Sequence, residues 1–393
     1  MNPIFITLFI FILSCAQTSR ENNNHKVQNQ STPPKAQVES DQVTIVDSII
    51  RIHHKLVQIV SLNTARAVHT TTLLHNGKIL ICGGFAGNNN YISSVEIYDP
   101  ILNTFRTAGN MSVPRISHSA TLLPDGKVLI AGGYDGTYLS STEIFDPLTE
   151  TFSPGTELNS PRMGHTATLL KNGKILFAGG VGTGWTFLKS AELYDIDAKS
   201  FSHTDSMFSE REAHTATLLK DGTVLISGGH VGRRANIKIN TSAEIYDPVS
   251  QQFVEISHMN VKRHKHDAVL LKDGKVLITG GADETDYDGI YKSAEIYHPD
   301  LRSFTNISNM CYPRFKHNGS SVLLLDGNVL LTGGNNHGEI YNIANNSFEM
   351  IDGNMKSKHY FSSAILMQNG DVLITGGYDE RTRPMNNAWI YRH

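Results

Sequence analysis

The sequence predicts an all-β protein in which seven copies of one four-stranded unit surround an axis. Pairs of adjacent glycines recur at spacings of 49, 47, 49, 52, 53 and 43 residues. An Asn-Gly or Asp-Gly dipeptide precedes every pair, and this is a strong hairpin signal because both residues tolerate positive φ. Only 39% of the 393 residues are hydrophobic and 33 are glycine, which suits a fold with many tight turns. A period near 50 residues with four short strands per unit indicates a seven-bladed β-propeller. The pairs are Gly83-Gly84, Gly132-Gly133, Gly179-Gly180, Gly228-Gly229, Gly280-Gly281, Gly333-Gly334 and Gly376-Gly377.

Each unit divides into four expected strands, A to D. Strand A is a β-branched and apolar run such as 165–170, and the Asn-Gly or Asp-Gly turn separates it from strand B. Strand B ends in the glycine pair. Strand C reads Glu-Ile-Tyr and stops at Asp-Pro, where the proline removes a hydrogen-bond donor. Strand D carries a Phe.

These residues resemble the kelch repeat, which has a double glycine, a Tyr in the third strand and an aromatic residue in the fourth. The resemblance extends over about residues 56–393. It implies a propeller with strand A along the central axis and strand D at the rim. The usual Trp of strand D is Phe in six copies: Phe105, Phe152, Phe201, Phe253, Phe304 and Phe348.

The two ends of the repeat region are expected to share one blade. The last copy stops after the strand C that contains Trp389 and Tyr391. Residues 55–62 have strand character and precede Arg66 as a strand D should. We therefore predict that an N-terminal strand completes the seventh blade and removes the free edge.

The first residues predict export. Residues 4–13 are almost wholly apolar, too few to span a bilayer but typical of a signal peptide. Ile12-Leu13-Ser14-Cys15 resembles a bacterial lipobox, so we expect a signal peptide over 1–15 with lipidation at Cys15. The alternative is an ordinary signal peptide cut near Cys15. We expect a disordered tether over 16–42 and the propeller over 43–393.

The expected location is the outer membrane or cell surface, with a periplasmic or secreted protein as the alternative. The chain has 34 Lys and Arg against 37 Asp and Glu, a net charge of −3. This balance argues against a nucleic-acid partner. Three cysteines cannot build a disulfide framework. We expect a monomer that contacts the membrane only through its lipid and that needs no cofactor.

Two polar positions of the repeat are expected to be structural. One histidine recurs seven times around a circle, so these side chains cannot converge on one metal ion. Arg66 and its equivalents precede the histidine by three residues, with Lys356 in the seventh copy. Strand C begins with Glu, replaced by Trp389 in that same copy. We infer that Arg and Glu pair across the glycines within a blade; a ligand-binding role for the Arg is the alternative. The histidines are His69, His118, His165, His214, His266, His317 and His359.

The B–C and D–A loops are expected to form a binding surface, which we call the loop face. The B–C loops contain 11, 9, 11, 14, 13, 4 and 11 residues, whereas the A–B turns are uniform. Aromatic and Arg side chains suit recognition of a protein or a glycan. An acidic run from Asp283 to Asp288 leaves a Ca²⁺ site open as a further possibility. The candidate ligand-binding residues are Arg233, Arg234, Trp185, Tyr287, Tyr291 and Tyr378.

These features favour a non-enzymatic binding or scaffold module. The sequence has no nucleophile elbow, phosphate loop or zinc signature, and no catalytic or metal residue is assigned. The alternative is a carbohydrate-active enzyme, of the oxidase or sugar isomerase type, with its site at the mouth of the propeller channel. Kelch propellers include galactose oxidase-like enzymes, but none of their copper ligands can be placed on a residue of this sequence.

Overall fold

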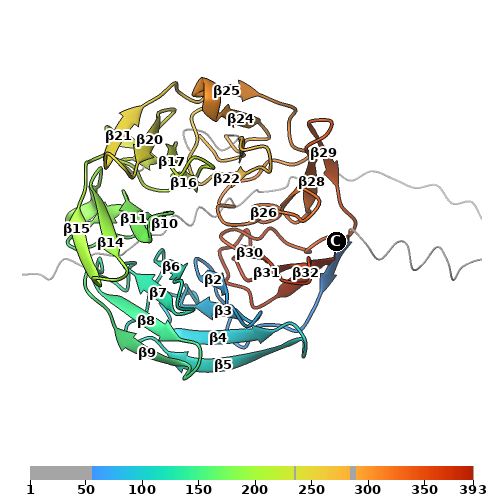
Figure 1. The fold of residues 1–393 in the computed structure, drawn as a ribbon. Helices are drawn as coiled ribbons and strands as arrows, with labels where there is room; N and C mark the ends of the chain where they lie inside the picture. The colour runs from blue at the N-terminus through green and yellow to red at the C-terminus, as the bar shows by residue number, and fades with distance from the viewer. Residues whose placement is uncertain (1–54, 234–235, 284–288, 393) are drawn as a thin grey trace, which may run out of the picture. The chain divides into compact units, whose positions relative to one another are not determined.

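Seven antiparallel four-stranded sheets form a ring in the computed structural model, which describes residues 55–233, 236–283 and 289–392 (Figure 1). The predicted seven-bladed β-propeller is confirmed. The expected signal peptide and tether, including Cys15, lie outside the described residues. No helix within the described ranges is both long and apolar enough to cross a membrane.

Every blade has the strand order A-B-C-D from the axis to the rim. Blade 1 contains β2 (Thr70–Leu73), β3 (Ile79–Cys82), β4 (Ser94–Asp99) and β5 (Thr104–Asn110). Blade 2 contains β6 (Ser119–Leu122), β7 (Val128–Ala131), β8 (Thr142–Asp146) and β9 (Thr151–Pro154). Blade 3 contains β10 (Thr166–Leu169), β11 (Lys174–Ala178), β14 (Ala191–Asp195) and β15 (Ser200–His203). Blade 4 contains β16 (Thr215–Leu218), β17 (Val224–Ser227), β20 (Ala243–Asp247) and β21 (Gln252–Glu255).

The remaining blades follow the same plan. Blade 5 contains β22 (Asp267–Leu270), β23 (Val276–Thr279), β24 (Ala294–His298) and β25 (Ser303–Asn306). Blade 6 contains β26 (Ser321–Leu323), β27 (Val329–Leu331), β28 (Glu339–Asn342) and β29 (Ser347–Met350). Blade 7 contains β30 (Ser363–Leu366), β31 (Val372–Thr375), β32 (Ala388–Arg392) and β1 (Lys55–Gln58). Two short ribbons extend B–C loops: β12 (Val181–Gly182) with β13 (Thr186–Phe187), and β18 (His230–Val231) with β19 (Lys238–Ile239). Single 3₁₀ turns are η1 (Thr183–Trp185) and η3 (Pro299–Leu301).

The ring closes through the N-terminal strand. β1 pairs antiparallel with β32, with Lys55 opposite Arg392 and Gln58 opposite Trp389. The predicted closure is confirmed, although the strand is shorter than the apolar stretch that suggested it. Because strand C runs away from the loop face, Lys55 enters the propeller at the opposite face. We call that face, formed by the A–B and C–D turns, the turn face.

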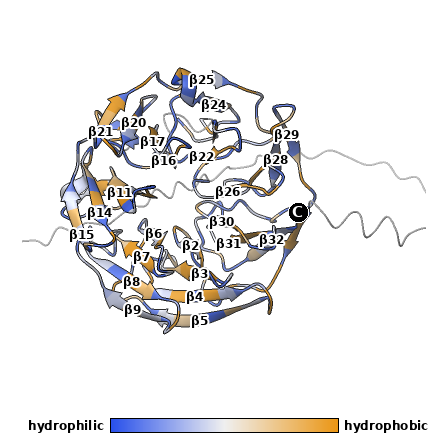
Figure 2. Cartoon of the chain, viewed as in Figure 1, coloured by the Kyte–Doolittle hydropathy of each residue, from blue (hydrophilic) through white to orange (hydrophobic). Residues whose placement is uncertain are grey.

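The hydrophobic core is divided among the interfaces between neighbouring blades. Leu80 and Ile97 of blade 1, for example, pack with Val128 and Phe145 of blade 2. Six further clusters join the other neighbours, including the one between blades 7 and 1. Hydrophobic residues are accordingly prominent in β3, β4 and β7 (Figure 2). Removing water from both faces of every sheet stabilises the ring without a single central core.

Candidate functional site

The double glycines connect neighbouring blades beneath the loop face. The backbone N–H of Gly180 donates to the carbonyl oxygen of Arg211 in the next blade, at 2.9 Å. The equivalent bond from Gly377 to Arg66 joins blades 7 and 1. Both glycines of a pair have positive φ, and a Cβ on Gly180 would lie 2.5 Å from the carbonyl oxygen of Met163. Only glycine fits this approach of two backbones.

The predicted Arg–Glu pair is present in six blades and is buried. In blade 3, Arg162 donates to Glu192 at 2.6 Å and to the carbonyl oxygen of Gly179 at 2.8 Å. The pKa of Arg162 is lowered, because the effect of burial exceeds the opposing effect of the Glu192 carboxylate. The second oxygen of Glu192 accepts the backbone N–H of Asn159 at 2.7 Å, which fixes the D–A loop. These arginines therefore hold the loop face together and do not line it. The six pairs are Arg66–Glu96 at 2.8 Å, Arg115–Glu143 at 3.0 Å, Arg162–Glu192 at 2.6 Å, Arg211–Glu244 at 2.5 Å, Arg263–Glu295 at 2.9 Å and Arg314–Glu339 at 2.8 Å.

The seventh blade corrects the expected alignment of the last repeat. His359 takes the position of the arginine: its carbonyl oxygen accepts the N–H of Gly334, and its Nδ1 lies 2.7 Å from the carbonyl oxygen of Gly376. Its ring packs edge-on against Trp389, which replaces the glutamate. Ser362 lies where the other blades have their histidine, beside Gly377. Assigning Lys356 and His359 to the arginine and histidine positions was therefore wrong by three residues.

The other six histidines join neighbouring blades through hydrogen bonds. His118 Nε2 lies 3.0 Å from Thr70 Oγ1 in the preceding blade, and His165 Nε2 lies 3.0 Å from Ser119 Oγ. Burial, followed by the neighbouring arginine, lowers the pKa of His118 to about 3. These imidazoles are therefore neutral structural groups at physiological pH.

The loop-face mouth of the channel is ringed by backbone hydrogen bonds that the sequence did not predict. In each blade the residue before the histidine or Ser362 has positive φ, and five of these seven residues donate to the equivalent carbonyl of the preceding blade. Lys316, for example, donates to Lys265 at 3.1 Å, and Phe361 donates to Lys316 at 2.7 Å. The seven residues are Val68, Ser117, Gly164, Ala213, Lys265, Lys316 and Phe361.

A row of aromatic rings crosses the loop face from blade 1 to blade 3. Successive ring centroids are 6.3 Å apart for Phe85 and Tyr91, 5.6 Å for Tyr91 and Tyr134, and 5.2 Å for Tyr134 and Tyr138. Trp185 follows 5.6 Å from Tyr138, with the two ring planes perpendicular. We call Phe85, Tyr91, Tyr134, Tyr138 and Trp185 the aromatic row.

Two members of the aromatic row are buried in the fold, and the other three are partly exposed. Phe85 and Tyr134 directly follow double glycines and are buried. Tyr91, Tyr138 and Trp185 lie on B–C loops and are half-buried. The guanidinium of Arg233, from blade 4, lies over the Trp185 ring. Rings held by neighbouring blades can present apolar contact area with little loss of side-chain entropy.

The structure describes four of the six predicted ligand-binding residues and brings two of these four together. Trp185 and Arg233 meet at the end of the aromatic row. The ring centroid of Tyr291 instead lies 5.8 Å from the guanidinium carbon of the buried Arg263. Tyr378 was expected on the surface but is only 2% exposed, because it packs beside Tyr360 and Phe361. Arg234 and Tyr287 lie outside the described residues, as does most of the acidic run considered for Ca²⁺.

Tyr134 was missed in the sequence. It follows a double glycine, as Phe85 and Tyr378 do, and that shared position was the available signal. The row as a whole could not be predicted, because it depends on which B–C loops meet in space.

Potentially reactive side chains also gather near the mouth. His230 of blade 4 and His264 of blade 5 approach to 3.1 Å through their Nδ1 atoms, and Glu212 lies 3.5 Å from His230 Nε2. Burial lowers the pKa of His230 to about 3. Within the described ranges, no group of three or more His, Cys, Asp and Glu side chains could hold a metal ion. Cys82 and Cys311 are free thiols, and burial raises the pKa of Cys82 to about 12.

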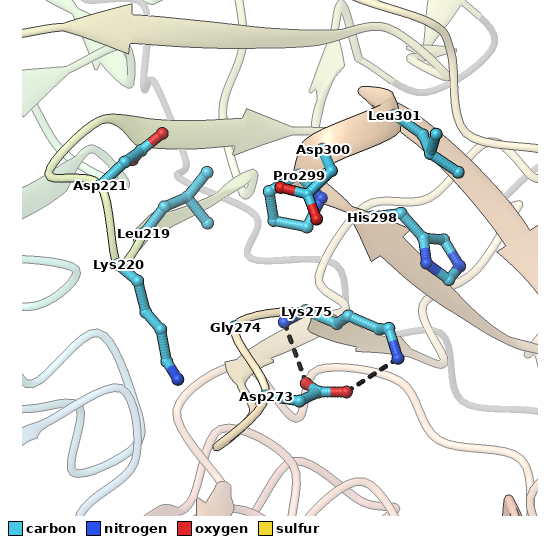
Figure 3. Close-up of a pocket in the computed structure, with 10 residues that line it drawn as sticks. All are labelled: Leu219, Lys220, Asp221, Asp273, Gly274, Lys275, His298, Pro299, Asp300 and Leu301. Carbon is cyan, nitrogen blue, oxygen red and sulfur yellow. Dashed lines mark hydrogen bonds and ion pairs between the residues drawn. The ribbon is translucent and has the colours of Figure 1, made fainter.

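A cleft of about 390 Å³ lies on the turn face between blades 4 and 5 (Figure 3). Its walls include the A–B turns that carry Lys220 and Asp273 and the C–D turn that carries Asp300 and Leu301. Lys275, which also lines the cleft, lies 2.8 Å from Asp273. The cleft is open and its described charges are mixed in sign, so it does not define a ligand class.

Comparison with known proteins agrees with the repeat architecture. Residues 66–112 and 115–159 match the Kelch motif. No curated protein matches the chain in sequence. Among solved structures, the chain is similar to a fungal alcohol oxidase of the AA5 family, determined in complex with copper. That likeness has a TM-score of 0.66 and 17% identity, over 85% of this chain and 75% of the oxidase. At that identity the likeness extends to the fold alone.

Proposed function

Because the chain is a seven-bladed propeller of kelch repeats, we propose that it is a non-enzymatic binding module whose loop face takes a protein or glycan ligand. The aromatic row is the observation that supports this proposal. Most other polar residues of the repeat are occupied in holding the ring together, as the six buried Arg–Glu pairs illustrate. The row, by contrast, lies on variable loops and ends at an exposed arginine.

The chemistry of the row suits a ligand with apolar or sugar-ring surfaces. Half-buried Tyr91, Tyr138 and Trp185 offer ring area and hydroxyl or indole N–H groups at the same positions. Arg233 adds a positive charge and several hydrogen-bond donors beside Trp185. Aromatic and Arg side chains of this kind supply much of the binding energy in recognition surfaces.

A glycan array and a pull-down against envelope and host proteins identify the ligand class. The wild-type chain is expected to retain a restricted set of ligands, and Trp185→Ala should lose them. Val254→Ala, on the outer strand of blade 4, is the matched control and should bind as the wild type does. Retention of the ligands by Trp185→Ala would remove the aromatic row from the binding site.

Export and anchoring complete the proposal. The apolar residues 4–13 and Cys15 support a lipoprotein of the outer membrane or cell surface, with a periplasmic or secreted protein as the alternative. Cys15→Ser should move the protein from the membrane fraction to the soluble fraction. An unchanged membrane fraction in that variant would contradict lipidation at Cys15.

A carbohydrate-active oxidase is the second candidate, raised by the fold likeness to the AA5 alcohol oxidase. Its expected place is the mouth of the channel, but Glu212, His230 and His264, which approach one another there, do not form a group that could hold a metal ion. Copper content after purification, measured with a sugar or alcohol oxidation assay, separates the two candidates. Stoichiometric copper with turnover would favour the oxidase, and a binding module should show neither.

A further inference from the structure

Single apolar side chains project from the turn face at equivalent points of four blades. Ile101 is 93% exposed, Leu148 92%, Val249 92% and Leu301 72%. Each lies in the turn between strands C and D, shortly after the proline that ends strand C. We call these four residues the apolar tips.

The local backbone fixes three of these tips. The N–H groups of Ile101, Leu148 and Val249 donate to the aspartate that precedes the proline, at 3.0, 2.9 and 2.9 Å. The aspartate thereby closes a small turn and directs the next apolar residue outward. Equivalent turns of a ring end at similar heights, so one flat surface can contact several tips together.

Exposed apolar residues are distributed unequally between the two faces. Among the described residues, Leu102 and Leu325 join the four tips on the turn face. At the loop-face end, the described residues of this class are Val60, Phe208 and Met350, the last residue of β29. The described residues of the turn face have no comparable excess of one charge sign. Lys127, for example, pairs there with Asp146 at 2.9 Å, and Lys174 pairs with Asp195 at 3.3 Å.

The N-terminal segment joins the propeller at the turn face. Lys55 pairs with Arg392 at that end of blade 7, and β1 then runs toward the loop face. The 54 preceding residues, which include the apolar stretch 4–13 and Cys15, are therefore attached to the turn-face rim. An anchor at Cys15 would hold this face at high local concentration beside a bilayer.

We propose that the turn face rests on the lipid surface, with the apolar tips in the interfacial region and the loop face directed away from the membrane. The inference rests on the anchoring proposed above and deepens it by giving the propeller an orientation. It replaces the expectation that the protein contacts the membrane only through its lipid. It leaves the aromatic row accessible to ligands. Because the turn face carries charges of both signs, including the paired Lys127 and Lys174, contact should depend on apolar insertion and change little with salt.

The test places a tryptophan on each face of the anchored, full-length protein. In a Cys311→Ser background, the Cys15 thiol is coupled to a maleimide lipid in phosphatidylcholine vesicles, so anchoring does not depend on natural lipidation. Leu148→Trp reports on the turn face. Phe208→Trp, an exposed apolar position of the loop face, is the matched control. Quenching by brominated lipid is measured for both variants and for the unsubstituted background.

Leu148→Trp should gain at least twofold more quenching than Phe208→Trp, at low and high salt. Replacing Ile101, Val249 and Leu301 by Ser should remove that excess. Equal quenching of the two reporters, or stronger quenching of Phe208→Trp, would overturn the orientation. A blue-shifted Leu148→Trp spectrum without lipid quenching would also overturn it, in favour of a second copy covering the turn face. Native lipidation is tested separately by Cys15→Ser, so failure of anchoring and failure of orientation are distinguishable.

Discussion

His359 lies edge-on against Trp389, with ring centroids 4.4 Å apart and ring planes at 79°. In the other six blades these two positions hold a buried arginine and glutamate. Both members of the pair differ in the blade that is completed by the N-terminal strand. Ion pair and aromatic pair thus serve the same purpose, which is to hold the D–A loop over the double glycine.

Exchanging the aromatic pair for the ionic pair should show strong coupling. His359→Arg or Trp389→Glu alone places an uncompensated charge in a buried site and should cost on the order of 3–5 kcal/mol. The double variant should cost clearly less than the sum of the two. Urea unfolding of all four proteins measures the coupling. Additive losses would show that the two positions do not form one unit.

Removing either partner of the ionic pair of blade 3 should lower the stability of the protein more than removing both. Arg162→Met leaves the buried Glu192 carboxylate without its partner, and Glu192→Met leaves the guanidinium alone. Each single change should lower the free energy of unfolding by about 3–5 kcal/mol. Changing both to Met should recover part of that loss. A single variant with wild-type stability would contradict the structural role.

Stability should fall steeply in mild acid. Burial lowers the pKa of His118, His165 and His317 to about 3, so the unfolded chain binds protons near pH 6.5 that the folded chain does not. The contribution of these neutral histidines to the free energy of unfolding is therefore fully present above pH 6.5 and is lost as the pH falls toward 3. Asp267 acts in the opposite direction, because burial raises its pKa to about 6 and folding then favours its protonated form.

The buried histidines therefore predict that the free energy of unfolding falls between pH 7.5 and 5.5, and Asp267 offsets part of that loss. His118→Gln should make that pH dependence shallower. The free energy of unfolding, measured by urea titration across this range, provides the check. A flat profile would show that these histidines can take up protons within the folded ring.

The second glycine of each pair should not tolerate alanine. Gly180 has φ +95°, and its added Cβ would meet the carbonyl oxygen of Met163. Gly180→Ala should cost several kcal/mol through steric overlap in addition to backbone strain. Gly184 also has positive φ but no atom within 4 Å of an added Cβ, so Gly184→Ala should cost only about 1–2 kcal/mol. Equal losses in thermal unfolding would contradict the close approach of Gly180 to the Met163 backbone.

The repeated parts of the fold could be predicted because each has a local chemical requirement. Asn76-Gly77 and its equivalents specify the A–B turn, and the joint change at Trp389 and its partner indicated the Arg–Glu pair. The exact partner in blade 7 was missed, because three-residue spacing to a histidine gave a false match at His359. Ser362, which lies at the histidine position, carries no such signal.

The site was less predictable than its scaffold. Val68, Lys316 and Phe361 at the channel mouth have a left-handed backbone conformation. None of these residue types is typical of positive φ, so the sequence did not indicate it. Tyr378 looked like a surface aromatic but is covered by its neighbours Tyr360 and Phe361. The contact between Trp185 and Arg233 joins loops of two blades, so local sequence could not reveal it.

The most direct test of the binding proposal is the affinity of Trp185→Ala for whichever ligand the wild-type chain retains on the glycan array or in the pull-down. Loss of a buried aromatic anchor should weaken binding by about 30-fold or more, equivalent to about 2 kcal/mol. Tyr138→Ala should weaken binding in the same direction, and Val254→Ala should leave it unchanged. Calorimetric titration of the four proteins should therefore place Trp185→Ala well below the wild type, with Val254→Ala beside it. Equal affinities of Trp185→Ala, Tyr138→Ala and the wild type would contradict the assignment of ligand binding to the aromatic row.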